Sequence, residues 1–200
     1  MRVLSPPRSV PAIGVRCRTR GFTLVELMIT VAVAAVLVMI AVPSFNNIIN
    51  ANRLSTAANE IVGALNVARM EAIKRNAGTQ FCSDLAGNNN TDTLGAACSG
   101  STQGGPGAVV ALTNGTPATV QVRTSSAALT LPVQLSGNVT AIRYTGQGLG
   151  YNATLSSSSL YSGTIATVCT TALSSNNVIV INMTTGSIVS AAAPTTGTCP

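Results

Sequence analysis

The stretch of 21 residues from Phe22 to Val42 contains a single charged residue, Glu26, and is otherwise almost entirely apolar. As an α-helix this stretch would be roughly 31 Å long, which matches the hydrocarbon core of a bilayer. A carboxylate inside a membrane costs on the order of 2.5–3.5 kcal/mol, so it normally has a partner or a role. The sequence therefore predicts a membrane-spanning helix at residues 22–42 in which Glu26 has a function.

A cleaved secretory signal peptide is the alternative for this region, because basic residues precede the apolar run and Ala32-Val33-Ala34 offers a small-residue cleavage site. The length of the run and its carboxylate argue against that reading. Arg16, Arg18 and Arg20 lie just before the run, whereas the next basic residue after it is Arg53. The distribution of positive charge predicts a cytoplasmic N-terminus and a periplasmic remainder, where disulfides form.

The excess positive charge belongs to the N-terminal segment and not to a binding surface. The formal net charge is +6, but five of the 11 basic residues precede position 21. From Phe22 onward the chain contains six basic and five acidic residues. The chain also has no histidine, which removes the commonest general base and the commonest metal ligand. We therefore expect neither an enzyme nor a cofactor.

A helical pattern continues beyond the apolar run. Pro43 predicts a bend or an interruption, and Lys74 and Arg75 suit the C-terminal end of a helix before a stop at Gly78. Apolar residues recur at spacings of three and four, which places them on one helical face. They are Leu54, Ala58, Ile61, Leu65, Ala68 and Ala72, preceded by Phe45, Ile48 and Ile49. We expect one long helix from about Thr23 to about Asn76, with residues 43–77 forming an amphipathic continuation.

Residues 78–200 are rich in Thr, Ser, Val, Gly and Asn, with short β-branched runs between turn residues, which predicts a β-rich head. The expected strands are 108–112, 118–123, 128–133, 139–144, 164–170, 178–183 and 187–190. Asn114-Gly115 and Thr185-Gly186 are hairpin signals. Because βαβ alternation is absent, we expect an α+β fold, with the long helix packed on an antiparallel head.

The segment Arg20-Gly21-Phe22-Thr23-Leu24-Val25-Glu26-Leu27 resembles the processing signal of type IV pilins and of the pseudopilins of type II secretion. The resemblance implies that residues 1–21 are a leader, that prepilin peptidase cuts after Gly21, and that Phe22 becomes the methylated N-terminus. It also implies that Glu26 sets the filament register, by pairing with the free amine on Phe22 of a neighbouring subunit.

The resemblance extends into the head. Ile142 to Leu149 and Val178 to Gly186 are similar to the GspH/FimT group of minor pseudopilins and minor pilins. This similarity implies a pilin-like fold and a structural and assembly subunit of a type II secretion pseudopilus or a type IV pilus. It further implies other pilin or pseudopilin subunits as partners, and a location in the inner membrane and then in a filament.

Five cysteines are present, of which Cys17 falls in the leader. The other four are Cys82, Cys98, Cys169 and Cys199, which allow three pairings. We favour Cys82 with Cys98 and Cys169 with Cys199, because each pair closes a turn-rich loop, and the other pairings stay open. A zinc site would suit paired Cys-x-x-Cys spacings, which are absent, so we interpret the cysteines as structural disulfides.

Two further binding sites can be considered. Asp84, Asp92 and the asparagines Asn88 to Asn90 could offer oxygen ligands to calcium, but a solvated flexible loop is the simpler interpretation, and we expect no metal. Some FimT-like proteins bind DNA during natural transformation through an arginine-bearing C-terminal tail. Here no basic residue follows Arg143, which leaves Arg123 and Arg143 for a small patch. A DNA-binding minor pilin is therefore the alternative function, with DNA an improbable partner.

Overall fold

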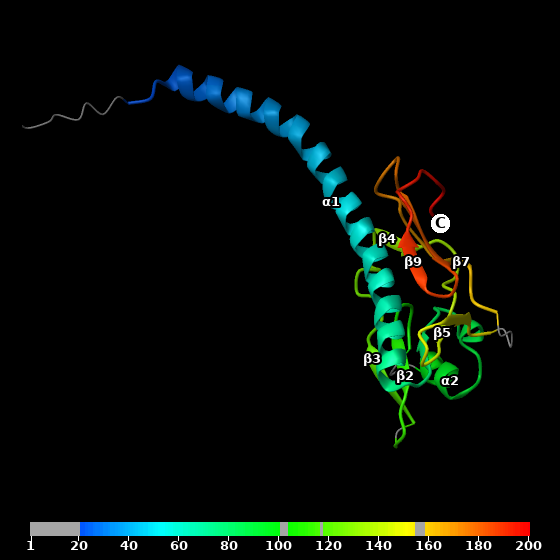
Figure 1. Ribbon diagram of the computed structural model, residues 1–200. Helices are drawn as coiled ribbons and strands as arrows, with labels where there is room; N and C mark the ends of the chain where they lie inside the picture. The colour runs from blue at the N-terminus through cyan, green and yellow to red at the C-terminus, as the bar shows by residue number, and fades with distance from the viewer. Residues whose placement is uncertain (1–20, 101–103, 117, 155–158) are drawn as a thin grey trace, which may run out of the picture. The chain divides into compact units, whose positions relative to one another are not determined.

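The computed structural model describes residues 21–100, 104–116, 118–154 and 159–200 (Figure 1). The predicted leader, apart from Gly21, lies outside these residues, as does Cys17. The chain divides into two compact units, one ending at Val42 and the other beginning at Pro43, and each is described by itself. Helix α1, Leu24–Arg75, contributes to both units.

In the first unit, α1 begins with a side-chain cap that the sequence analysis did not identify. The backbone N–H of Glu26 donates to Thr23 Oγ1 at 3.2 Å, and the N–H of Leu27 donates to the Thr23 carbonyl at 3.1 Å. Thr23 and Glu26 thus stand at the first and fourth positions of a Thr-x-x-Glu capping pattern. The side chains from Phe22 to Val42 are exposed, and this part of α1 is apolar and long enough to cross a membrane.

The second unit contains the rest of α1 and an antiparallel β-rich head, as the sequence predicts, and the strands of the head form two sheets (Figure 1). Sheet A has the order β3-β2-β1-β5-β6, and sheet B has the order β4-β7-β8-β9. The strands of sheet A are β1 (Thr79–Phe81), β2 (Val109–Leu112), β3 (Thr119–Arg123), β5 (Ile142–Tyr144) and β6 (Gly150–Asn152). The strands of sheet B are β4 (Val133–Leu135), β7 (Gly163–Thr170), β8 (Val178–Thr184) and β9 (Ile188–Ala191).

Both sheets pack on the same face of α1. Each of the six helix residues predicted for this face, from Leu54 to Ala72, is at most 1% exposed, and Ala57 and Ala64 are buried with them. They share one core with Phe81 and Ile142 of sheet A and with Ile165 and Ile181 of sheet B. Because alanine has almost no side chain, the strands can approach the helix closely while Leu54, Ile61 and Leu65 fill the spaces between them. The C-terminal half of α1 therefore holds the head together.

The opposite face of sheet A carries a smaller core. Val110 of β2 packs there with Cys82, Leu94 and Cys98. Leu94 and Cys98 belong to the short helix α2, Thr93–Ser99, which follows a 3-10 turn at Ala86–Asn89. Sheet A thus lies between α1 and the α2 region.

Several sequence predictions need correction. The strand expected at 128–133 is a loop up to the start of β4, because Pro132 has no N–H to donate and Ala128 N donates to the Glu60 carboxylate. The end of the helix, by contrast, agrees with the expectation of about Asn76: α1 ends at Arg75, and Asn76, with a φ of 47°, terminates the helical path. Phe45 and Ile48 are exposed, so the buried stripe begins at Leu54.

A glycine at the β8–β9 turn allows the two sheets to meet. Gly186 has a φ of 65°, its N–H donates to the carbonyl of Tyr161, and its carbonyl accepts from the N–H of Gly150 in β6. A Cβ atom at Gly186 would lie 2.6 Å from the Gly150 carbonyl oxygen. Only glycine combines this backbone conformation with so close a backbone contact.

We expect Gly186→Ala to lower the free energy of unfolding by about 2 kcal/mol or more. The left-handed conformation alone costs an alanine on the order of 1–2 kcal/mol, and the contact with a backbone atom adds to this. Gly115→Ala is the matched control, because a Cβ at Gly115 meets no atom within 4 Å. Urea unfolding of the detergent-solubilised chain measures both effects, and equal stability of the two variants would contradict this account.

Candidate functional site

The residues predicted for processing are the first described residues of the first unit. A Cβ added at Gly21 would meet no atom within 4 Å, so packing does not explain a glycine at this position. Phe22 is 72% exposed and immediately precedes the capping residue Thr23. The backbone around Gly21 and Phe22 is therefore free of the regular helix that begins at Leu24.

Glu26 has one local interaction that its sequence position alone did not suggest. It lies in the first turn of α1, where an acidic side chain interacts favourably with the positive end of the helix dipole. Its N–H is capped by Thr23, so Thr23 belongs to this N-terminal site even though the sequence analysis did not select it. The Thr-x-x-Glu spacing was the signal that could have identified it.

The four cysteines of the head form two disulfides, Cys82–Cys98 and Cys169–Cys199, which is the pairing favoured from the sequence. The first joins the residue after β1 to α2 and closes the small core of sheet A. The second joins β7 to the C-terminal segment. Each is expected to stabilise the head by roughly 3–4 kcal/mol through its effect on the unfolded chain.

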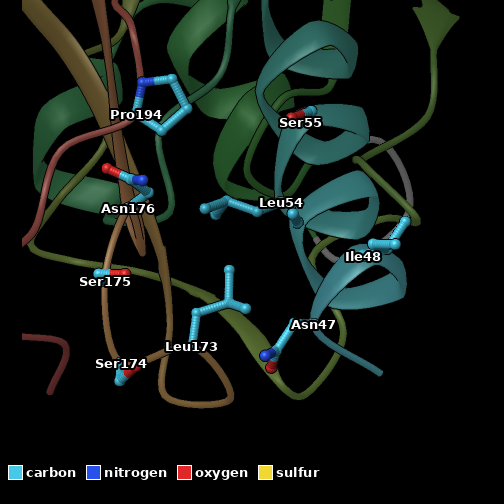
Figure 2. A pocket seen from close by; sticks show the side chains of 10 residues that line it. Asn47, Ile48, Leu54, Ser55, Leu173, Ser174, Ser175, Asn176 and Pro194 are labelled. Atoms are coloured by element: carbon cyan, nitrogen blue, oxygen red, sulfur yellow. The ribbon is translucent and has the colours of Figure 1, made fainter. Parts of the chain in front are cut away.

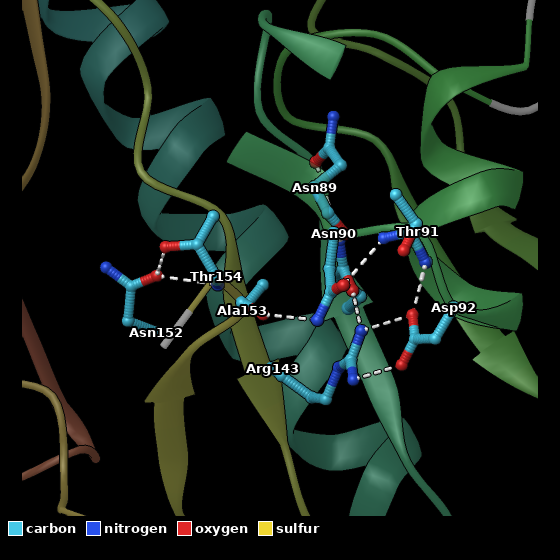
Figure 3. Close-up of polar contacts among 10 residues, drawn as sticks. Asn89, Asn90, Thr91, Asp92, Arg143, Asn152, Ala153 and Thr154 are labelled. Atoms are coloured by element: carbon cyan, nitrogen blue, oxygen red, sulfur yellow. Dashed lines mark hydrogen bonds and ion pairs between the residues drawn. The ribbon is translucent and has the colours of Figure 1, made fainter. Parts of the chain in front are cut away.

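The segment between Cys82 and Cys98, interpreted from the sequence as a solvated flexible loop, is in fact anchored on sheet A (Figure 3). Asn89 is buried, and its side-chain oxygen accepts from the N–H of Ser83 at 2.7 Å. Asp84 accepts from the N–H of Val139 at 2.7 Å. Within the described residues, no group of three or more His, Cys, Asp and Glu side chains gathers around one point where a metal ion could bind.

Asp92 has two structural roles in this segment. One carboxylate oxygen caps α2 by accepting from the N–H of Gly95 at 3.0 Å. Both oxygens also pair with the Arg143 guanidinium, whose Nη2 is 2.8 Å from Asp92 Oδ1 and 2.6 Å from Gln80 Oε1 (Figure 3). Hydrogen bonding to Arg143 holds the pKa of the Asp92 carboxyl below its usual value, against the opposing effect of partial burial.

The two arginines considered for DNA do not form a patch. Arg143 lies on the face of sheet A that carries α2, because it pairs with Asp92. Arg123 lies on the other face, next to α1, since its Nη1 would be 3.5 Å from a Cβ at Gly63. The sheet separates their charges, and the charge of Arg143 is already balanced by a carboxylate.

An apolar helical half that starts directly after Gly21-Phe22-Thr23, followed by a second helical half packed on antiparallel sheets, defines the class of pilin-like proteins. In agreement, residues 16–42 match the family model described as the prokaryotic N-terminal methylation motif. Residues 57–186, which run from the buried face of α1 to the β8–β9 turn, match the model described as type II transport protein GspH. The chain belongs to this GspH family. No curated protein and no solved structure matches it.

The pairing of Asp92 with Arg143 predicts a pH-dependent stability. Because the pKa of Asp92 is lowered by folding, its ionised form stabilises the head above the ordinary value of 3.8, and this stabilisation is lost as the pH falls through the lowered value. We expect Asp92→Asn to destabilise the chain at pH 5–7 and to make progressively less difference below pH 3.8. Asparagine still caps α2, so the change isolates the charge.

Chemical unfolding of both proteins across this pH range provides the measurement. The control is the same substitution made in an Arg143→Gln background, where the effect of Asp92→Asn on stability should lose most of its pH dependence. A pH-dependent effect that persists without Arg143 would assign the lowered pKa to another cause.

Proposed function

We propose that this protein is a minor pseudopilin or minor pilin, a structural and assembly subunit that prepilin peptidase processes after Gly21. The observation that carries the proposal is the combination, in one chain, of the methylation motif at residues 16–42 and the GspH match at residues 57–186. The description of the matched family favours the type II secretion pseudopilus over the type IV pilus.

In this role, the segment from Phe22 to Val42 is the membrane anchor before assembly and the packing helix afterwards. Its exposed apolar side chains suit a lipid environment and equally suit the apolar surfaces of neighbouring helices. Three arginines before the span and none directly after it support a cytoplasmic leader and a periplasmic head. The two disulfides are compatible with an oxidising periplasm.

Glu26 is assigned to subunit register. Once the leader is removed, Phe22 carries a free amine, and an apolar filament interior offers a buried carboxylate few other cations. Pairing of Glu26 with the amine of a neighbouring subunit would neutralise both groups. Thr23 supports this arrangement by fixing the first turn of the helix in which Glu26 lies.

We further propose that the head has no catalytic activity of its own and acts through contacts with other subunits. The chain contains no histidine, and its last lysine is Lys74, at the end of α1. The serines and threonines of the head therefore lack the side chains that most often activate a hydroxyl nucleophile.

The experiment is an intact-mass measurement of the chain from membranes of its host, with N-terminal peptide mapping. We expect loss of residues 1–21 and one methyl group on the amine of Phe22. Cleavage near Ala34 instead would release a soluble periplasmic protein and would contradict the proposal.

The role of Glu26 is tested separately by Glu26→Gln. We expect this variant to be cut after Gly21 as the parent is, but to be depleted at least about tenfold from the filament fraction, because an uncharged amide cannot pair with the amine. Glu71→Gln is the matched control, since Glu71 lies on the same helix but pairs with Lys74 and Arg75. Normal incorporation of Glu26→Gln would remove Glu26 from the assembly mechanism.

A further inference from the structure

A hollow lies beside α1 within the second unit, between the helix and the segment that leads into β4. It has a volume of about 460 Å³ and is bounded by helix residues 49–56 on one side and by residues 128–133 on the other. Its apolar lining comes from Ile49, Ala128, Leu131 and Val133, and Arg53 is the one charged side chain in it. We call this space the Arg53 hollow.

The wall that faces α1 is held in place by the helix itself. The backbone N–H of Ala128 donates to Glu60 Oε2 at 3.2 Å. A turn follows, in which the N–H of Val133 donates to the Thr130 carbonyl at 3.0 Å, so Leu131 lies at the tip of this turn. The side chain of Leu131 is 83% exposed. The Arg53 hollow is therefore a preformed feature of the fold with an apolar edge.

Arg53 is an exposed cation that forms no ion pair with any of the described residues. Helix positions 49, 50, 56 and 57, which lie one turn away from it, carry no acidic residue. The next acidic residue of α1 is Glu60, roughly 10 Å further along the helix axis, and its carboxylate is already bonded to Ala128. The fold thus leaves a guanidinium, with its planar set of donors, beside an apolar surface.

A second hollow, on another flank of the same turns of α1, lacks such a charge. It has a volume of about 490 Å³ and lies between helix residues 47–55 and the β7–β8 loop with Pro194. Leu54 and Leu173 point into it, and its other lining side chains are uncharged (Figure 2). We call this second space the neutral groove. Of the two, the Arg53 hollow is the one whose charge can select a partner.

We propose that the Arg53 hollow binds an apolar segment of a different pilin-like subunit, and that this segment carries an aspartate or glutamate. The carboxylate would accept two parallel hydrogen bonds from the Arg53 guanidinium. The apolar neighbours of that carboxylate would cover Leu131 and remove its side chain from water. Pairing neutralises the charge that the contact desolvates, so the apolar and the ionic parts of the site support each other.

The charges of the head favour a different protein over a second copy of this chain as the occupant. The second unit contains six basic and four acidic residues, so it offers fewer carboxylates than cations. Each of its acidic side chains also has a partner within its own chain: Glu60 accepts from Ala128, Glu71 pairs with Lys74 and Arg75, Asp84 accepts from Val139, and Asp92 pairs with Arg143. This inference rests on the proposed function, in which a minor subunit contacts subunits of other kinds.

The test places a photo-cross-linking amino acid at position 131 of the full-length chain in membranes of its host. We expect a cross-linked product with another protein that carries a pilin-like N-terminal motif. Mass spectrometry should map the attachment to an apolar segment that includes an aspartate or glutamate. The same amino acid at Leu173, in the neutral groove, is the matched control, and no cross-link to that segment is expected from there.

Substitutions at Arg53 test the ionic part of the contact. Arg53→Gln should lower the yield of the cross-linked product by roughly tenfold or more, because loss of one member of a buried ion pair costs at least that much affinity. Arg53→Lys keeps the charge and should retain most of the yield. Lys74→Gln is the matched control, since Lys74 is a cation of the same helix that pairs with Glu71. Arg53→Glu should be rescued when the mapped carboxylate of the partner is replaced by lysine.

Several outcomes would overturn the proposal: no cross-link from position 131, attachment to lipid or to a second copy of this chain, attachment to a segment without an acidic residue, or an unchanged yield in Arg53→Gln. Processing at Gly21 and incorporation into filaments are measured in the same samples. If both are normal while the cross-link fails, the proposed function stands and only this contact is wrong. If both are absent, the proposed function itself is wrong.

Discussion

The head of this protein depends on the packing of the alanine-rich face of α1 against two sheets at once. Ala58, Ala68 and Ala72 allow close approach, and Leu54 and Leu65 fill the intervening space. Among the described residues, the only other apolar cluster on either sheet is the small core under α2. The same helix begins as an apolar segment at Leu24, inside the region that matches the methylation-motif model. One element therefore combines the core of the head with an apolar segment that is long enough to cross a membrane.

The elements that could be predicted from the sequence were those with a periodic pattern or a turn signal long enough to distinguish helix from strand. The helical stripe from Leu54 to Ala72 and the hairpin at Thr185-Gly186 were confirmed because they involve local, repeated signals. The three-residue strands β1 and β6 were missed, although β1 is the centre of sheet A. Their pairing comes from long-range contacts, such as Gln80 opposite Val110 and Arg143, which no local pattern encodes.

For the candidate site, too, local motifs could be predicted from the sequence, whereas long-range contacts could not. The N-terminal motif was evident because it consists of contiguous residues around Gly21, within the region that matches the methylation-motif model. The ion pair between Asp92 and Arg143 joins residues 51 positions apart, so it could not be predicted from their spacing in the sequence. The sequence could supply only the general expectation that an isolated arginine pairs with an acid. The strand expected at residues 128–133 was wrong for a similar reason: the local sequence resembles a strand, but the N–H of Ala128 donates to the distant Glu60 carboxylate.

The distribution of charge in the head has a consequence for how its contacts respond to the environment. No acidic or basic side chain follows Arg143, so sheet B contributes only neutral residues from β7, β8 and β9, and the two cysteines that follow Arg143 are joined in a disulfide. Coulombic forces at such a surface hardly change with salt or mild acidification. Contacts made through sheet B would therefore keep the same strength at high salt and in mild acid. The ion pair of Asp92 with Arg143 would weaken at high salt and would be lost as the pH falls through the lowered pKa of Asp92.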